Sequence, residues 1–281
     1  MLYLQRRPAP PLDAFVVSIW FCRNAPRPHL LERVLPGGSV QLIINLAEDQ
    51  TRMYDSTPRG LDCRTAPGTV LSGVSSRFQI IDTAEQQHVA GIVFRPGGTL
   101  PFVAPPASEL SNLDVPLECI CGSASTRRLR EQLLAASRPE AALHTLERWL
   151  TAMFGDRACH PAVSFALAQF HAEPSVTRID AVKGVISLSP KRFIERFKAE
   201  VGVTPKRYCR LLRFQRAVKI AHGGTSLDWA QLALECGYFD QAHFIHEFRE
   251  FSGLTPGAYQ AATTSFQNHV TFLQSNGNSF P

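Results

Sequence analysis

Long apolar segments are missing from this sequence. Hydrophobic residues make up 44% of it, which is ordinary for a globular protein, but no run approaches the roughly 18 residues of a membrane-spanning helix. The N-terminal stretch MLYLQRRPAPPLDAF also lacks the apolar centre of a secretion signal. We therefore expect a protein of the cytoplasm with no membrane partner.

A disulfide framework is missing as well. The seven cysteines are odd in number and scattered along the chain, which suits a reducing compartment. Cys119 and Cys121 are the one close pair, and the sequence adds no second pair and no histidine pair at zinc spacing. The sequence therefore predicts no metal site and no cofactor.

Catalytic patterns are equally scarce. The glycines of residues 94–98, FRPGG, lack the Lys-Ser/Thr ending of a phosphate-binding loop and the helix context of a dinucleotide site. His88 lies in an apolar segment and is interpreted as a core residue. Because no Ser-His-Asp set or pair of carboxylates stands out, we predict no catalytic residues and no enzyme.

What the sequence does contain is one pattern written twice. The first copy, SPKRFIERFKAEVGVTPKRY, spans residues 189–208, and the second, DQAHFIHEFREFSGLTPGAY, spans residues 240–259. Phenylalanine, isoleucine, glycine, Thr-Pro and tyrosine recur at a constant offset of 51 residues, as in Phe193 and Phe244. A constant offset over so many positions indicates a duplicated structural unit.

Each copy has the local signals of two successive helices. Ser189 and Asp240 are N-cap residues, and the two phenylalanines that follow in each copy are four apart, on one helix face. Gly202 and Gly253 end these helices, and Thr-Pro begins the next one.

A shorter helix is expected before each copy, at residues 177–183 and 226–236, where apolar residues have helical spacing. Residues 207–222 predict a longer helix that joins the two units rigidly. The duplicated region is therefore predicted to contain two helix-turn-helix units.

Charge is unevenly distributed, although the net charge is only +5. Residues 176–222 contain twelve lysines and arginines against three acidic residues, a balance of +9. Residues 223–261 carry −4, and residues 1–155 are nearly neutral at +1. A basic cluster that coincides with a duplicated helical motif is typical of a nucleic-acid binder.

The first half of the chain is predicted to be rich in β-strands. Short apolar segments bounded by Gly/Pro turns predict strands at residues 15–21, 40–46, 78–81 and 88–94. Amphipathic spacing predicts two helices at residues 125–136 and 139–154.

Together these patterns predict an α+β protein. Residues 1–155 are expected to form a β-rich domain, barrel-like or sandwich-like, with two helices. Residues 156–261 are expected to form an all-α domain of two helix-turn-helix units joined by a long helix. Residues 262–281 are mostly polar and are expected to be a disordered tail.

The second copy resembles a known family signature. Residues 233–259 are similar to the second helix-turn-helix of AraC/XylS-type bacterial transcription regulators, A-x-x-x-G-[FY]-x-D-[QS]-x-x-F-x-x-x-F-[KR]-x-x-x-G-x-[ST]-P-x-x-[YF]. The match includes Ala233, Gly237 and Asp240 and covers nearly every position. The first copy departs from it: Val182 replaces the alanine, and Ile186 lies at the place of the glycine.

The resemblance implies a sequence-specific transcription regulator of the bacterial cytoplasm that binds double-stranded DNA. It also implies that residues 1–155 bind a small-molecule effector, form a homodimer, or both. RNA polymerase is a further candidate partner. No ligand motif is matched, so no ligand residues are transferred, and activation versus repression stays open.

The resemblance places base-facing residues on the exposed side of each recognition helix. In the first helix these are Lys191, Arg192, Ile194 and Glu195; in the second they are Gln241, Ala242, His243, Ile245 and His246. Lysine suits guanine, glutamine suits adenine, glutamate accepts from cytosine, and isoleucine contacts the thymine methyl group. Lys198 and Arg210 are expected to contact phosphate.

Three alternatives stay open. In the first, the chain is a bifunctional regulator whose N-terminal domain is an enzyme acting on a small ligand or on DNA, which requires a reactive cysteine in an electropositive pocket. The chain would otherwise be an anti-activator that dimerises and binds DNA poorly, against which the basic cluster argues. Finally, the acidic second unit would contact RNA polymerase or the N-terminal domain in place of DNA.

Overall fold

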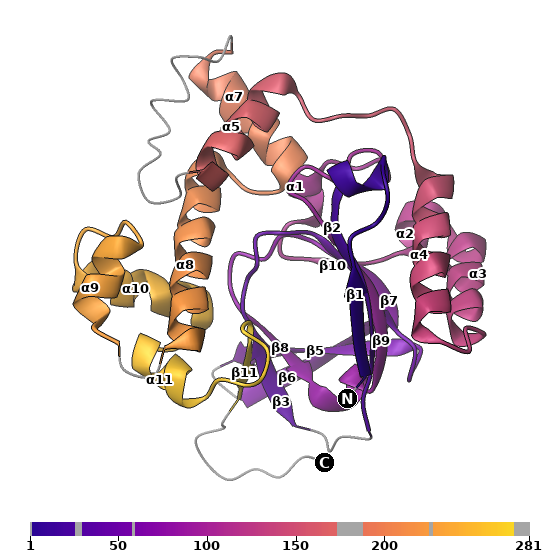
Figure 1. The fold of residues 1–281 in the computed structure, drawn as a ribbon, viewed down its shortest axis with the longest axis horizontal. Helices are drawn as coiled ribbons and strands as arrows, with labels where there is room; N and C mark the ends of the chain where they lie inside the picture. The colour runs from indigo at the N-terminus through magenta and orange to yellow at the C-terminus, as the bar shows by residue number, and fades with distance from the viewer. Residues whose placement is uncertain (1, 26–29, 58–59, 173–187, 225–226, 273–281) are drawn as a thin grey trace.

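A computed structural model describes residues 2–25, 30–57, 60–172, 188–224 and 227–272 (Figure 1). The predicted helix at residues 177–183 and the departures at Val182 and Ile186 lie outside these residues.

The N-terminal region contains two antiparallel sheets rather than the closed barrel that the sequence left open. The larger sheet has the strand order β1 (Leu2–Arg6), β2 (Val16–Arg23), β9 (His88–Phe94), β4 (Gln41–Asn45), β7 (Thr69–Ser72) and β10 (Asp114–Pro116). The smaller sheet has the order β11 (His269–Thr271), β3 (Leu31–Val34), β8 (Gln79–Asp82), β5 (Gln50–Thr57) and β6 (Gly60–Pro67).

The centre of the larger sheet is the most apolar part of the N-terminal region. Ile19 of β2, Leu42 of β4 and Ile92 of β9 are each fully buried. Gly91 of β9 lies directly against the ring of Trp20. A Cβ at this position would be only 2.5 Å from that ring, so there is no room for a side chain. Most positions of these three strands are buried, which explains why runs of apolar residues predicted them correctly.

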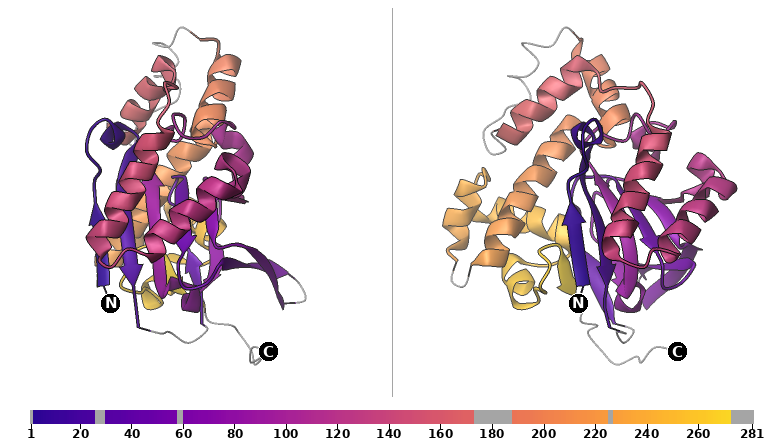
Figure 2. Two further views of the ribbon diagram at one scale, coloured as in Figure 1. Left: turned by 90° about the vertical axis from the view of Figure 1, so that its right-hand side faces the viewer. Right: turned by 45° about the vertical axis from the view of Figure 1, so that its right-hand side comes forward.

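The α-helices described in this region come late in it: α1 (Ala107–Leu110) precedes β10, and α2 (Glu118–Cys121), α3 (Ser123–Leu134) and α4 (Pro139–Met153) follow it. The predicted helices at residues 125–136 and 139–154 correspond to α3 and α4. Helix α4 packs on β2 and β9 through Leu143, Leu146 and Leu150, so α3 and α4 cover the outer side of the larger sheet (Figure 2).

The described C-terminal helices are α5 (Pro161–Ala172), α7 (Pro190–Val201), α8 (Pro205–Gly223), α9 (Trp229–Glu235), α10 (Gln241–Ser252) and α11 (Pro256–Ala261). The expected caps are present in both copies. The Ser189 hydroxyl accepts a hydrogen bond from the Arg192 amide, and the Asp240 carboxylate accepts one from the His243 amide at 2.7 Å. Gly202 and Gly253 end α7 and α10 at φ of +100° and +70°.

Each unit has its own aromatic core, built from the repeated positions. In the first, Phe193, Phe197 and Tyr208 contact one another through ring edges. In the second, Phe248 packs edge-on against Phe244 and Tyr259 in the same way. These side chains are all buried, so the repeated aromatic positions form the core of each unit and do not face solvent.

The expectation of a disordered tail is wrong for residues 262–272. After α11 the chain returns to the N-terminal region, where β11 pairs with β3 as the edge strand of the smaller sheet (Figure 1). Val270 is fully buried there, and the His269 ring lies 3.0 Å from the Glu32 carboxylate. Three residues suffice to form this strand because they complete an existing sheet edge.

Candidate nucleic-acid interface

Helix α7 presents a polar face opposite its buried phenylalanines. All five residues that the sequence assigned to DNA on this helix are exposed: Lys191, Arg192, Ile194, Glu195 and Lys198. Ser189 caps the amino end of α7, and this end is exposed to solvent. Helix-turn-helix proteins present their base-contacting residues at this end of the recognition helix.

Helix α10 presents a less uniform face. Gln241, Ala242, His243 and His246 are exposed, whereas Ile245 is half-buried. The side chains of Gln241 and His246 make no hydrogen bond to any residue that the structure describes. His243 differs, because its ring packs edge-on against Tyr238 and its Nε2 lies 3.7 Å from Glu247 Oε2.

Arg210 lies in a different setting from the one that the sequence suggested. Its Nε donates to Glu247 Oε2 at 2.6 Å, and its Nη2 donates to Glu250. Both carboxylates belong to α10, so Arg210 ties α8 to the second recognition helix. Its donors Nε and Nη2 are therefore occupied within the protein.

Two more arginines of α8 join the same network. Arg207 pairs with Glu250, and Arg213 Nη2 lies 3.5 Å from Glu247 Oε1. Burial raises the pKa of the Glu250 carboxyl, but hydrogen bonds from Arg210 and Arg207 outweigh it and lower this pKa below its ordinary value. The carboxylates of α10 thus neutralise part of the basic run that the sequence singled out.

The remaining cations of α7 and α8 lie on the surface. No ion pair joins any of the following to another described residue: Lys191, Arg192, Lys198, Lys206, Arg216 and Lys219, all of them exposed. Sequence reasoning did not name Lys206, Arg216 or Lys219, although the charge balance of residues 176–222 included them. Unlike Arg207, Arg210 and Arg213, these six side chains keep their charge available at the surface.

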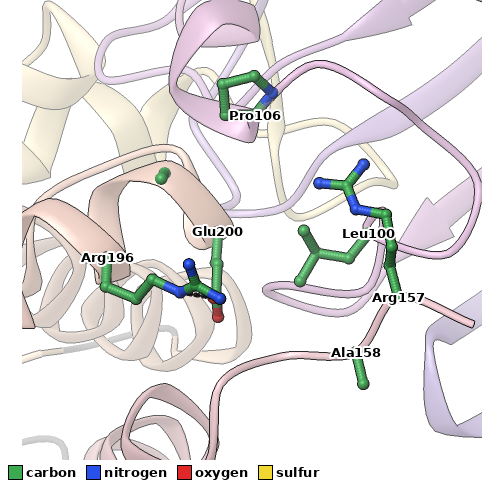
Figure 3. A pocket seen from close by; sticks show the side chains of 7 residues that line it. Leu100, Pro106, Arg157, Ala158, Arg196 and Glu200 are labelled. Atoms are coloured by element: carbon green, nitrogen blue, oxygen red, sulfur yellow. Dashed lines mark ion pairs between the residues drawn. The ribbon is translucent and has the colours of Figure 1, made fainter.

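A cavity of about 310 Å³ lies behind α7, between the linker and the N-terminal region (Figure 3). Arg157 and Arg196 flank it, and Leu100 and Pro106 form an apolar wall. Arg157 Nη1 donates to the carbonyls of Val103 and Ala104, both at 2.9 Å, which fixes its guanidinium in place.

The third charged group of the cavity is the buried carboxylate of Glu200. It accepts hydrogen bonds from the His160 amide at 2.9 Å and from the Cys159 thiol at 3.0 Å, and it pairs with Arg196. Burial, together with Glu200, raises the pKa of the Cys159 thiol to about 12. Cys159 is therefore a protonated packing residue and not a nucleophile.

The described part of the chain contains neither a cluster of metal ligands nor a membrane-spanning helix. Among these residues, no three His, Cys, Asp or Glu side chains gather as metal ligands would. No helix within the described ranges is long and apolar enough to span a membrane. Cys119 and Cys121 lie on the short helix α2, the first exposed and the second half-buried.

Two family descriptions match the chain. Residues 184–262 match the family described as Helix-turn-helix domain, and residues 4–116 match Domain of unknown function (DUF6597). No curated protein matches the sequence significantly.

Several solved structures have similar folds. The DNA-binding domain of AdpA, solved in complex with a target DNA, is 19% identical, and the match covers 37% of this chain and 93% of that one, with a TM-score of 0.34. An AraC-type regulator from Chromobacterium violaceum is 25% identical over 36% of this chain and 90% of its own, with a TM-score of 0.33. ToxT from Vibrio cholerae is 7% identical over 94% and 99%, with a TM-score of 0.46.

Proposed function

We propose that this chain is a DNA-binding transcription regulator of the AraC type that reads duplex DNA with both α7 and α10, because residues 184–262 match a helix-turn-helix family and the two helices have the same caps and stops. In helix-turn-helix proteins the recognition helix lies in the major groove with its amino-terminal residues at the base edges. Two recognition helices joined by α8 suit successive major grooves on one face of the duplex, about 34 Å apart.

The observation that supports this proposal is the same local structure around both helices. Ser189 and Asp240 cap the two amino ends, and the phenylalanines of each helix face the core. The opposite, polar face of each helix is exposed at its amino-terminal turns. The sequence and the fold thus give both helices the face that base recognition requires.

We assign roles by the chemistry of the exposed side chains. Base contacts are assigned to Lys191, Arg192, Ile194, Glu195, Gln241, Ala242, His243, Ile245 and His246. Lys198 is assigned to phosphate. Arg210 is assigned to holding α8 against α10, because Glu247 and Glu250 already bind its donors. Gln241 and His246 carry the largest share of readout by α10, since neither has a partner among the described residues.

A selection from random duplexes tests the proposal. The full-length protein is incubated with a pool of random DNA, and the retained duplexes are sequenced. We expect two blocks of preferred bases whose centres are about one helical turn apart, 10–10.5 base pairs. One block alone would show that only one unit reads bases, and no enrichment at low salt would contradict the assignment.

Control through residues 1–155 is the second part of the proposal. The cavity behind α7 combines the Arg157 guanidinium and the Arg196–Glu200 ion pair with an apolar wall. This leaves one net positive charge, which suits a small molecule that has one carboxylate and an apolar body. Small carboxylates that bind there should raise the midpoint of thermal unfolding of the full chain, and Arg157→Ala should abolish the rise. Equal shifts in both proteins would exclude this cavity.

The remaining assignments follow from the role of a bacterial regulator. We propose a division at residue 155 between a regulatory and a DNA-binding domain, and a location in the cytoplasm, where the chromosome is accessible. Self-association and contact with RNA polymerase stay predictions. The enzyme alternative gains no observation in its favour: Cys119 is exposed, Cys121 is half-buried, and neither lines the cavity behind α7.

A further inference from the structure

One loop of the N-terminal region touches both helix-turn-helix units at equivalent positions. This 73–78 loop connects β7 to β8. Val74 lies against Gly202, which ends α7, and Phe78 lies against Gly253, which ends α10. The two glycines are the same position of the duplicated unit, so a single loop contacts the carboxyl ends of both recognition helices.

The contact with the first unit is tight. A Cβ at Gly202 would lie 3.2 Å from Val74 Cγ2 and 3.3 Å from the carbonyl oxygen of Ala107. Helix α1, which contains Ala107, packs against α7 beside this contact (Figure 1). Glycine at 202 is thus required twice, by its φ of +100° and by the closeness of the loop.

The contact with the second unit includes direct hydrogen bonds. The Phe78 amide donates to the Phe251 carbonyl at 2.8 Å, and a Cβ at Gly253 would lie 2.5 Å from the Phe78 ring. Arg207 Nη2 donates to the Ser76 carbonyl at 2.6 Å, while its Nη1 pairs with Glu250 of α10. Arg207 therefore links the loop, the first turn of α8 and the second recognition helix.

The loop itself is held rigidly by the segment around Asn112. The Asn112 side-chain oxygen accepts hydrogen bonds from the Ser76 backbone amide at 2.7 Å and from the Ser76 hydroxyl at 2.8 Å. The Asn112 backbone N–H donates to the Val74 carbonyl at 3.1 Å. Gly73 leaves no room for a side chain, because a Cβ there would lie 1.7 Å from the Leu110 carbonyl oxygen. A loop fixed in this way can position the elements that it touches.

We propose that the 73–78 loop sets the distance and angle between the two recognition helices, and thereby the spacing of the two DNA half-sites that the protein accepts. The inference rests on the proposed function, in which both helices read bases. The loop contacts the carboxyl ends of α7 and α10, so it leaves their DNA-facing amino ends open. Val74 and Phe78 are positioning residues that act through Gly202 and Gly253 and do not touch DNA.

The proposal gives the N-terminal region a specific part in recognition. Without the loop, the described links between the two units all pass through α8, which packs on α10 through Phe214 and through the ion pairs of its arginines. Rotation of the units about α8 would then allow half-sites at several spacings. With the loop in place, spacings other than the selected one require its contacts to break.

The test measures binding as a function of half-site spacing. Full-length protein is bound to the selected operator and to versions with one to five base pairs inserted or removed between the blocks. For Phe78→Ala and Val74→Ala we expect discrimination between the best spacing and its neighbours to fall about fivefold or more, the lower range of coupling between sites. Leu113→Ala is the matched control, because this exposed side chain lies beside the loop and its backbone bond to Gly73 is kept.

The possible results distinguish a failure of the loop proposal from a failure of the proposed function. Failure of the unmodified protein to enrich two blocks would remove the proposed function itself. Two blocks in the unmodified protein, with the same spacing profile in Phe78→Ala and Val74→Ala, would overturn the inference alone. Should Phe78→Ala fail to fold, the profile of the milder Val74→Ala variant decides. Broader spacing in both variants, with unchanged base preference inside each block, supports the loop as the positioning element.

Discussion

The guanidinium of Arg210 on α8 forms an ion pair with the buried carboxylate of Glu247 on α10, with 2.6 Å between Nε and Oε2. The two residues are 37 positions apart in the chain, and Glu247 is only 2% exposed. A charge of the basic run is thus used inside the domain, where it fixes the second recognition helix to the joining helix.

This pair leads to a prediction about stability. Arg210→Ala leaves the buried Glu247 carboxylate with weaker compensation, and loss of one partner of a buried pair costs about 3 kcal/mol. We expect a lower free energy of unfolding in denaturant titrations and, at temperatures where the variant is folded, an unchanged salt dependence of DNA binding. A smaller salt slope with unaltered stability would show that Arg210 contacts phosphate after all.

Lys198 is expected to behave in the opposite way. It is exposed on α7 and pairs with no described acid, so Lys198→Ala should leave the unfolding free energy nearly unchanged. Loss of one phosphate contact should weaken binding to all sequences alike and reduce the slope of log K against log salt by about one. Binding isotherms at several salt concentrations measure this slope, and an unchanged slope would remove Lys198 from the interface.

The returning C-terminal segment gives a prediction for the fold. Val270 lies on β11, the edge strand of the smaller sheet, and its side chain is fully buried. Val270→Ala should therefore lower the free energy of unfolding by about 2 kcal/mol. Thr271→Ala, at the exposed neighbouring position, is the control and should change it by less than about 0.5 kcal/mol. Equal effects of the two substitutions would mean that β11 contributes little to the stability of the chain.

Local signals in the sequence were sufficient for the recognition helices. Ser189, Asp240, Gly202 and Gly253 act within one helical turn of their own positions, and the structure confirms each of these caps and stops. The apolar strands β2, β4 and β9 were predictable for a similar reason, since burial on both faces requires continuous apolar residues.

Contacts between distant segments were not predictable in this way. Strand β11 contains only three residues, and nothing in HVT indicates that β3 is its partner. Strand β5, QTRMYDST, is polar because it lies in the smaller sheet with much of its surface half-exposed. The partner of Arg210 lies on another helix, so its charge alone suggested phosphate. The role of the 73–78 loop depends on three segments that meet only in the folded chain.

The central claim is that both units read DNA, and base preference in variants of α10 tests it most directly. Gln241→Ala and His246→Ala are each compared with the unmodified full-length protein in selections from random duplexes. Our account predicts relaxed preference at particular base pairs of one block, worth about 1–3 kcal/mol for each substitution, with the other block unchanged. If both variants keep the affinity and the base preference of the unmodified protein, the second unit does not read DNA.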